Sequence, residues 1–212
     1  MLLFSGQHKL QGENFNPNIM PKTEVKKKES YTPAFKILDA PGIEDDFYLN
    51  LLDWGEQCLA ISLKPDVYIQ NPNTSFITTL QQGYENGGGA TSLAWKPGSS
   101  ILAVGKDTDH LNVTQIWDLE KMRVLRTMQN HTDRVSSLAW NENILSTGSK
   151  DSKIINYDMR KKEALSVMHG HKKEVCGLKW SPDGTQLASG SNDNSLCIWS
   201  LKNSDSPQFC LR

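Results

Sequence analysis

The sequence lacks the long apolar run and the charge imbalance that would point to a membrane or to nucleic acid. Its 212 residues carry a formal net charge of -1, so no global field favours nucleic acid or an anionic membrane surface. No apolar stretch approaches the length of a spanning helix. The first ten residues, MLLFSGQHKL, interrupt their apolar stretch too early for a secretory signal. We therefore expect neither nucleic-acid nor membrane partners.

Cysteine is scarce, and its spacing differs from that of a metal site. The four cysteines are Cys58, Cys176, Cys197 and Cys210. None of them forms the Cys-x-x-Cys pair that structural zinc sites commonly use. In the absence of a secretory signal we expect reduced thiols. The sequence thus predicts no metal, no cofactor, and a location in the nucleus and cytoplasm.

A helical period is also missing, and a longer repeat takes its place. No segment of more than about ten residues shows the 3.6-residue apolar period of a helix. Four strand-like stretches instead end in tryptophan at intervals of 41, 45 and 40 residues: Trp54, Trp95, Trp140 and Trp180. A second aromatic residue follows each of them: Tyr68 (weakly), Trp117, Tyr157 and Trp199. A histidine also recurs after 40 residues, at His131 and His171.

Each repeat is predicted to form four short strands. In the last repeat EVCGLKWS and SLCIWSL alternate apolar and polar residues, and PDG and NDN mark turns. Four strands in about 40 residues are typical of a β-propeller blade. The sequence therefore predicts an all-β protein, a β-propeller of WD-repeat type with about four blades over residues 35–212. Residues 1–34, rich in Asn, Lys and Pro, are predicted to be a flexible segment.

An aspartate recurs at the tip of the NDN-type hairpin. In WD-repeat propellers, which these repeats resemble, a His, a Ser or Thr, an Asp and a Trp form a buried hydrogen-bonded chain within the blade. The matching residues are His171, Ser189, Asp193 and Trp199, and one repeat earlier His131, Ser146 or Thr147, Asp151 and Tyr157. We expect such a latch in each blade, because a buried carboxylate needs hydrogen-bond donors.

The same residue types also occur in a Ser-His-Asp catalytic triad. A catalytic site would not need a copy in successive blades, so the recurrence favours the structural role. No other nucleophile, base or metal cluster stands outside the repeat positions, and we expect no enzymatic activity.

One stretch is more specific than the repeat. Residues 35 to 54, FKILDAPGIEDDFYLNLLDW, closely resemble the entry into the propeller of the fizzy family, the cell-division-cycle activators of the anaphase-promoting complex. Two later stretches, ILAVGKDTDHLNVTQIWDL and GHKKEVCGLKWSPDGTQLASGSNDN, agree with it. The resemblance covers roughly residues 35–201.

The resemblance implies a seven-bladed propeller that binds degron peptides and carries substrates to a ubiquitin ligase. It implies that Asp46, with Asp45 beside it, helps to bind the arginine of a destruction-box peptide. It assigns to Asp53 part of a site for a Lys-Glu-Asn degron at the top rim, where Asn192 and Asn194 are also expected. A fixed carboxylate suits a guanidinium or an ammonium group. The simpler alternatives are a solvated acidic turn for Asp45 and Asp46, strand bracing for Asp53, and turn formation for the two asparagines.

The sequence also departs from the family. The resemblance implies about three further blades and an upstream DR(Y/F)IP docking box, neither of which is present. The final Leu211-Arg212 is similar in character to the family's terminal Ile-Arg dipeptide, but it follows a different blade, and we interpret it as coincidence. We therefore expect a family member that is shortened at both ends.

Three functional hypotheses remain. The first is a substrate adaptor or activator of the anaphase-promoting complex in mitosis, with ligase subunits, degron-bearing substrates and spindle-checkpoint proteins as partners. The second is a half-propeller that binds the ligase or a checkpoint partner without delivering substrate. The third, an unrelated WD-repeat scaffold such as a chromatin-binding propeller, is disfavoured by the stretch LDAPGIEDDFYLNLLDW.

Overall fold

The computed structural model describes residues 34, 37–74, 76–80, 88–107, 112–201 and 206–211. The chain divides into two units, Met1–Asp39 and Ala40–Arg212, whereas the sequence predicted a boundary after residue 34. Apart from Ala34, the predicted flexible segment lies outside the described residues, as does Arg212. No helix in the described part of the chain is long and apolar enough to cross a membrane.

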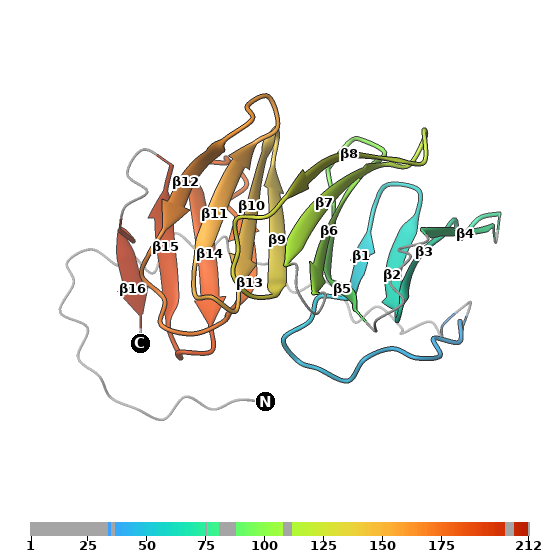
Figure 1. The fold of residues 1–212 in the computed structure, drawn as a ribbon, viewed down its shortest axis with the longest axis horizontal. Coiled ribbons are helices and arrows are strands. Elements are labelled where there is room, and N and C mark those ends of the chain that lie inside the picture. Colours follow the sequence, from blue (N-terminus) through green and yellow to red (C-terminus); the bar gives the residue numbers. More distant parts are fainter. Residues whose placement is uncertain are drawn as a thin grey trace, which may run out of the picture. The chain divides into compact units, whose positions relative to one another are not determined.

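Every regular element of the described residues is a strand, which confirms the predicted all-β class. Consecutive strands form four antiparallel sheets of four strands each, and we call these sheets blades 1 to 4 (Figure 1). Their strands are β1 (Leu52–Trp54), β2 (Leu59–Leu63), β3 (Asp66–Gln70) and β4 (Ile77–Leu80); β5 (Gly89–Trp95), β6 (Ile101–Asp107), β7 (Val113–Asp118) and β8 (Arg123–Met128); β9 (Val135–Asn141), β10 (Ile144–Ser149), β11 (Ile154–Asp158) and β12 (Ala164–Met168); and β13 (Val175–Trp180), β14 (Gln186–Ser191), β15 (Leu196–Ser200) and β16 (Phe209–Leu211).

The first strand of each blade contacts the first strand of the next. β1 contacts β5, β5 contacts β9, and β9 contacts β13. These four inner strands run in the same direction, as the parallel bridge between Asn50 and Ser92 indicates at the first junction. The arrangement is that of consecutive propeller blades, as the sequence predicted.

Strand register shows that the tryptophan repeat is a structural repeat. Each repeating tryptophan is the last or next-to-last residue of its inner strand. It lies opposite a leucine of the second strand: Trp54 and Leu59, Trp95 and Leu102, Trp140 and Leu145, Trp180 and Leu187. The aromatics Trp117, Tyr157 and Trp199 lie across from the same leucines. Tyr68 does not, because Leu59 pairs with Gln70 instead, so the weakest member of the predicted series is out of register.

Neighbouring blades are joined by side-chain hydroxyls bonded to backbone carbonyls. Ser62 Oγ donates to Ala90 O (3.2 Å), Ser92 Oγ to Val135 O (2.6 Å) and Ser137 Oγ to Val175 O (2.7 Å). Gly148, opposite Ser137, leaves the room that this approach requires, because a Cβ there would lie 2.4 Å from Ser137 Oγ. A Cβ at the equivalent Gly190 of blade 4 would meet nothing within 4 Å, since no described sheet follows it.

The same contrast appears in the apolar core between blades. One position of the fourth strand is occupied in turn by Leu80, Met128, Met168 and Leu211, each paired with an equivalent residue of the third strand. The first three are buried, with at most 4% of their surface exposed, whereas Leu211 is 44% exposed. The following blade covers this position in blades 1 to 3, and the outer face of blade 4 is apolar and uncovered by the described residues.

The pairing of β15 with β16 corrects one expectation. Cys197 lies directly opposite Cys210, with the Cα atoms 4.2 Å apart, and the two are joined by a disulfide. Cys58 and Cys176 are free thiols. The sequence predicted four reduced thiols because a secretory signal was lacking, and the 13-residue separation of Cys197 and Cys210 matches no recognised motif. Their juxtaposition depends on the register of two strands.

Truncation of the repeated core position tests the blade packing. Met168→Ala should lower the free energy of unfolding by about 2–5 kcal/mol, because it leaves a cavity between blades 3 and 4. Leu211→Ala should cost about 1 kcal/mol or less, because its side chain is already partly solvated. Urea denaturation followed by tryptophan fluorescence measures both. Equal losses would contradict the exposed position of Leu211.

Candidate functional site

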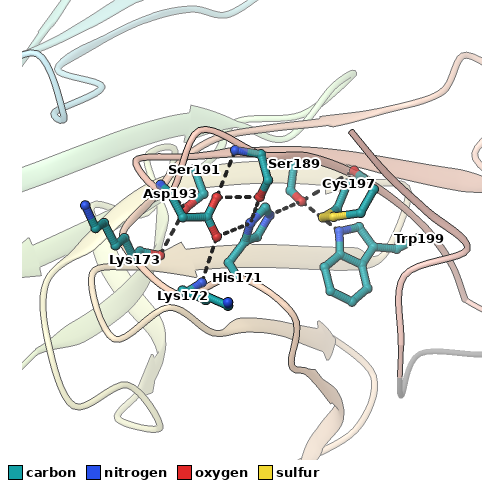
Figure 2. Close-up of a disulfide and its surroundings, with 10 residues drawn as sticks. His171, Lys172, Lys173, Ser189, Ser191, Asp193, Cys197 and Trp199 are labelled. Atoms are coloured by element: carbon teal, nitrogen blue, oxygen red, sulfur yellow. Dashed lines mark hydrogen bonds and ion pairs between the residues drawn. A yellow bond between two sulfur atoms is a disulfide. The ribbon is translucent and has the colours of Figure 1, made fainter. Parts of the chain in front are cut away.

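The predicted latch residues of blade 4 lie together in one hydrogen-bonded chain (Figure 2). Trp199 Nε1 donates to Ser189 Oγ (2.7 Å), and Ser189 Oγ lies 2.7 Å from His171 Nε2. On the other side of the ring, His171 Nδ1 lies 3.3 Å from Asp193 Oδ2 and 3.0 Å from Ser195 Oγ. A neutral imidazole that donates from Nδ1 and accepts at Nε2 satisfies every member of this chain.

The pKa values of the latch fit this charge arrangement. Burial lowers the pKa of His171, and Asp193 opposes that shift, so the imidazole is neutral at pH 7. Burial alone would raise the pKa of Asp193, but hydrogen bonds from the Ser195 hydroxyl and the Lys172 and Ser195 amides lower it well below its usual range. The aspartate is therefore a charged acceptor that ties the start of β13 to the β14–β15 hairpin.

Blade 3 has a shorter version of the latch. His131 Nδ1 lies 2.9 Å from Asp151 Oδ2, and His131 Nε2 lies 2.7 Å from Thr147 Oγ1. Of the two predicted hydroxyls, Thr147 occupies the latch, while Ser146 accepts a hydrogen bond from Trp180 Nε1 of blade 4 (3.1 Å). Tyr157 donates its hydroxyl to Asn130 Oδ1 (3.2 Å).

Asp151 is charged for the same reason as Asp193. Burial opposes the shift, but hydrogen bonds from His131 and from the amides of Lys153 and Thr132 lower the pKa of Asp151 to about 2. The two carboxylates thus have equivalent roles in neighbouring blades.

The expectation of a latch in each blade is wrong for blades 1 and 2, as far as the structure describes them. The register position of Thr147 and Ser189 is occupied there by Ile61 and Val104, which cannot accept or donate a hydrogen bond. In blade 2 the Trp117 indole donates instead to Gln115 Oε1 (3.2 Å). These two blades pack through an apolar cluster that includes Ala60, Leu80, Leu102 and Val104.

Geometry alone does not separate the blade 4 latch from a catalytic triad, but burial does. Ser189, His171 and Asp193 stand in the order that nucleophilic catalysis uses. Ser189 is only 2% exposed, and its oxygen already accepts the Trp199 N–H. A substrate carbonyl cannot reach it, so the chain of hydrogen bonds acts as a structural latch.

Acidification should weaken the latch in a defined direction. The folded-state pKa of His171 is lowered from 6.5, so the unfolded chain binds more protons below pH 6.5 and the free energy of unfolding falls as pH falls. His171→Gln should flatten this part of the profile relative to the unsubstituted chain. Urea midpoints measured from pH 7.5 to 5 provide the comparison, and parallel profiles for the two proteins would contradict the buried neutral imidazole.

The sequence-predicted peptide-binding residues lie at two opposite ends of the blades. We call one end the hairpin end, where the inner strands begin and the hairpin 192–194 lies, since Val175 pairs with Ser191. We call the other the tryptophan end, where Trp54, Trp95, Trp140 and Trp180 lie. Asp45, Asp46, Asn192 and Asn194 belong to the hairpin end. Asp53 belongs to the tryptophan end.

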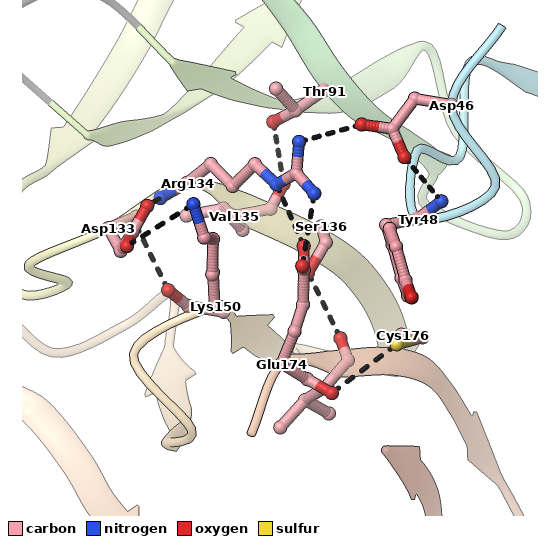
Figure 3. Close-up of polar contacts among 12 residues, drawn as sticks. Asp46, Tyr48, Thr91, Asp133, Arg134, Val135, Ser136, Lys150, Glu174 and Cys176 are labelled. Atoms are coloured by element: carbon pink, nitrogen blue, oxygen red, sulfur yellow. Dashed lines mark hydrogen bonds and ion pairs between the residues drawn. The ribbon is translucent and has the colours of Figure 1, made fainter. Parts of the chain in front are cut away.

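Asp46 is held by an arginine of the chain itself (Figure 3). Arg134 Nη1 donates to Asp46 Oδ2 (2.8 Å), and the amide of Tyr48 donates to Asp46 Oδ1 (2.9 Å). The same guanidinium forms a two-pronged contact with Glu174, from Nε to Oε1 (2.8 Å) and from Nη2 to Oε2 (3.0 Å). Arg134 thus joins the segment before β1 to the starts of β9 and β13.

These contacts set the charges of the network. The hydrogen bond from the Tyr48 amide and then the Arg134 guanidinium lower the pKa of Asp46, although burial opposes them. The hydrogen bond to Glu174 and then that to Asp46 raise the pKa of Arg134. One cation therefore faces two carboxylates, and the net charge of the three groups is negative.

A neutral contact reinforces the network. Asn50 Nδ2 donates to Ser136 O (2.6 Å) and to Cys176 O (3.2 Å), which fixes the start of blade 1 to blades 3 and 4. Arg134, Glu174 and Asn50 were missed by sequence reasoning. A usable signal was present for two of them, because oppositely charged residues precede Val135 and Val175 at the same repeat position, 40 residues apart.

The remaining candidates at the hairpin end are exposed. Asp45 receives no hydrogen bond or ion pair from the described residues, and its side chain faces solvent. Asn192 and Asn194 are exposed turn residues; the Asn192 amide donates to Glu174 O (2.9 Å), and Asn194 has a φ of 63°. Asparagine tolerates this left-handed conformation better than most residues do.

Asp53 lies apart from that group. Its Oδ2 accepts the amide of Trp95 (2.6 Å), so the side chain braces β1 against β5. It also lines a depression of about 740 Å³ formed by the inner strands of all four blades. The sequence expectation that the hairpin 192–194 shares a rim with Asp53 is therefore wrong, because the two lie at opposite ends of the strands. Among the described residues no group of three or more His, Cys, Asp or Glu could hold a metal ion.

Removing the central cation tests the network. Arg134→Met should lower the free energy of unfolding by about 2–4 kcal/mol, because it leaves Glu174, whose side chain is 6% exposed, without its partner. Lys150→Met is the control, since both side chains of its ion pair with Asp133 are exposed, 52% and 42%, and solvent screens that pair. Chemical denaturation measures both variants, and a loss no greater for Arg134 than for Lys150 would contradict the role of the network.

Comparisons with known proteins agree with this architecture. A family model described as the IFT140 first beta-propeller matches residues 76–207. One chain of the structure titled "Crystal Structure of Mitotic Checkpoint Complex" superposes on this chain with a TM-score of 0.80 and 38% sequence identity. The match covers 89% of this chain and 59% of that one. That similarity supports the predicted β-propeller of WD-repeat type.

Curated relatives are more specific. The anaphase-promoting complex subunit cdh1 of Dictyostelium discoideum is 46% identical over 186 residues, which cover 86% of this chain and 24% of that protein. The subunit cdc20 of the same organism is 47% identical over 168 residues, covering 78% and 33%. Protein FIZZY-RELATED 2 of Arabidopsis thaliana is 45% identical over 168 residues, covering 78% and 34%. The chain spans between 24% and 34% of the length of these three relatives. It belongs to the β-propeller family that the matching model describes and, by its curated relatives, to the fizzy family of WD-repeat activators of the anaphase-promoting complex.

Proposed function

We propose that this chain acts as a substrate-adaptor or activator subunit of the anaphase-promoting complex and recognises degron peptides in mitotic cell-cycle control. Support comes from the named relatives, which are subunits of that complex. The observation that carries the proposal is the acidic pair at the hairpin end, where Asp45 is exposed beside an Asp46 that is fixed by Arg134. The proposed role is binding without catalysis, in the nucleus and cytoplasm.

The acidic pair suits the arginine of a destruction-box peptide. A carboxylate offers about four lone-pair sites, and Asp46 uses one on each oxygen for Arg134 and Tyr48. Its remaining sites can each accept one further N–H, while the unpaired carboxylate of Asp45 can accept the other prong of a guanidinium. We therefore assign the main charge contact to Asp45 and an orienting contact to Asp46.

A Lys-Glu-Asn degron needs a different assignment. Asp53 lies at the tryptophan end, so it cannot bind one short peptide together with Asn192 and Asn194. We propose that Asp53 lines a separate subsite in the 740 Å³ depression, and that the two asparagines border the destruction-box site at the hairpin end.

Charge removal at Asp45 tests the main contact. Asp45→Asn should weaken binding of a fluorescein-labelled destruction-box peptide about three- to tenfold, the effect of losing one charge-assisted hydrogen bond near the surface. Fluorescence anisotropy measures the affinity. Glu142→Gln, an exposed acid at the tryptophan end, is the control that removes the same charge elsewhere, and equal weakening by both variants would contradict the assignment.

A second function is favoured by the solved neighbour, which is a chain of a mitotic checkpoint complex. In this alternative the chain binds the ligase or a checkpoint protein and does not deliver substrate. A ubiquitination assay with the anaphase-promoting complex separates the two roles, because an adaptor raises the turnover of a degron-bearing substrate whereas a non-delivering binder lowers it.

A further inference from the structure

A second concave site opens between blades 1 and 2 at the tryptophan end. This blade 1–2 pocket has a volume of about 420 Å³ and is lined by the β1–β2 turn, by β3 and β4, and by two turns of blade 2. Its volume falls within the range of ligand pockets. It includes neither Asp53 nor any residue of the hairpin end, but it adjoins the 740 Å³ depression that Asp53 lines, with which it shares Gly55, Glu56, Trp95 and Gly98.

Two carboxylates border this pocket without a cationic partner. Glu56 comes from the β1–β2 turn and Glu120 from the β7–β8 turn, and no described residue forms an ion pair with either. Glu56 extends toward blade 2, since its Oε1 lies 4.0 Å from the position that a Cβ would take at Gly98. The rim of the pocket therefore carries negative charge from both blades and is complementary to a cation.

The pocket wall also contains a hydrogen-bond donor without an acceptor. Two of the repeating tryptophans use their indole N–H, Trp140 toward Ala94 O (3.0 Å) and Trp180 toward Ser146 Oγ (3.1 Å). The equivalent Nε1 of Trp95 is buried and has no acceptor among the described residues. Its ring instead lies against Gly55, where a Cβ would be 2.9 Å from Trp95 Cδ2. A buried donor without a partner is unfavourable. This N–H is closed to solvent, so a ligand carbonyl would satisfy it only with a shift of the Trp95 side chain on binding.

The rest of the lining is apolar and adaptable. Ile69 forms part of the floor, and Met122, 45% exposed, lies at the opening. A methionine thioether adjusts its shape to an incoming apolar group. The pocket thus combines an acidic rim, a free N–H donor and an apolar floor.

We propose that the blade 1–2 pocket binds a short peptide segment of a partner protein in which a lysine or arginine lies next to an apolar residue. The cation lies between Glu56 and Glu120 at the rim, and the apolar side chain packs on Ile69 and Met122. A shift of the Trp95 side chain on binding lets a peptide carbonyl accept its N–H. This site goes beyond the proposed degron contacts and does not require them.

A defined probe tests the site on the full 212-residue chain. The probe is a fluorescein-labelled Gly-Leu-Lys-Leu-Gly peptide, and its control replaces lysine by norleucine, which keeps the chain length and removes the charge. Fluorescence anisotropy at low salt should show binding of the lysine peptide that is about tenfold tighter than that of the norleucine peptide. Added salt should reduce this difference, since the rim is exposed.

Matched variants locate the probe. The double variant Glu56→Gln/Glu120→Gln should weaken binding about tenfold, and Trp95→Phe, which keeps the ring on Gly55 and removes the N–H, about threefold. Glu142→Gln/Glu163→Gln removes the same charge from the equivalent turns of blade 3 and should change nothing. The proposal is overturned if the lysine peptide does not bind, if norleucine binds equally, or if the blade 3 control weakens binding as much. Thermal unfolding verifies that each variant is folded, and the glutamate variants test the site independently of Trp95.

Discussion

The arrangement of this protein depends on how closely one inner strand approaches the next. A serine hydroxyl of one blade reaches a backbone carbonyl of the following blade at each of the three junctions. At the junction of blades 3 and 4 only a glycine leaves enough space for this approach. Because these bonds fix each blade against the next, equivalent positions of neighbouring sheets lie at the same level along the strands. The apolar residues at these positions therefore pack against one another.

The two ends of these strands have different chemistry. At the hairpin end Arg134 gathers Asp46 and Glu174 into a network that crosses from the segment before β1 to blade 4. At the tryptophan end the indoles and the acidic turns surround two concave sites. The groups at one end therefore do not contribute to the other, and the peptide sites that we propose at the two ends are built from different residues.

Blades 3 and 4 differ from blades 1 and 2 in how each sheet is held internally. Blades 3 and 4 use hydrogen bonds among a histidine, a hydroxyl and a carboxylate, whereas blades 1 and 2 use aliphatic contacts. A buried polar latch is directional and stabilises one hydrogen-bonding arrangement, whereas apolar packing depends on area and shape. Acidification therefore weakens the latches of blades 3 and 4, as it does the network of Asp46 with Arg134, whereas the apolar packing of blades 1 and 2 contains no group that titrates at low pH.

The sequence by itself determined the blade period, the strand order and the latch pairs, because these depend on groups close together along the chain. His131 and Asp151 are 20 residues apart, and His171 and Asp193 are 22 residues apart. Each pair lies within a single blade whose turns can be predicted from the sequence. Only the tertiary structure decided that Asp46 is paired with Arg134, 88 residues away, and that Asp53 lies at the opposite end from Asn192. It also decided that Cys197 faces Cys210. The physical reason is that these relations arise from the stacking of blades and from strand register, and a side chain's long-range partner is set by backbone positions that no local pattern encodes.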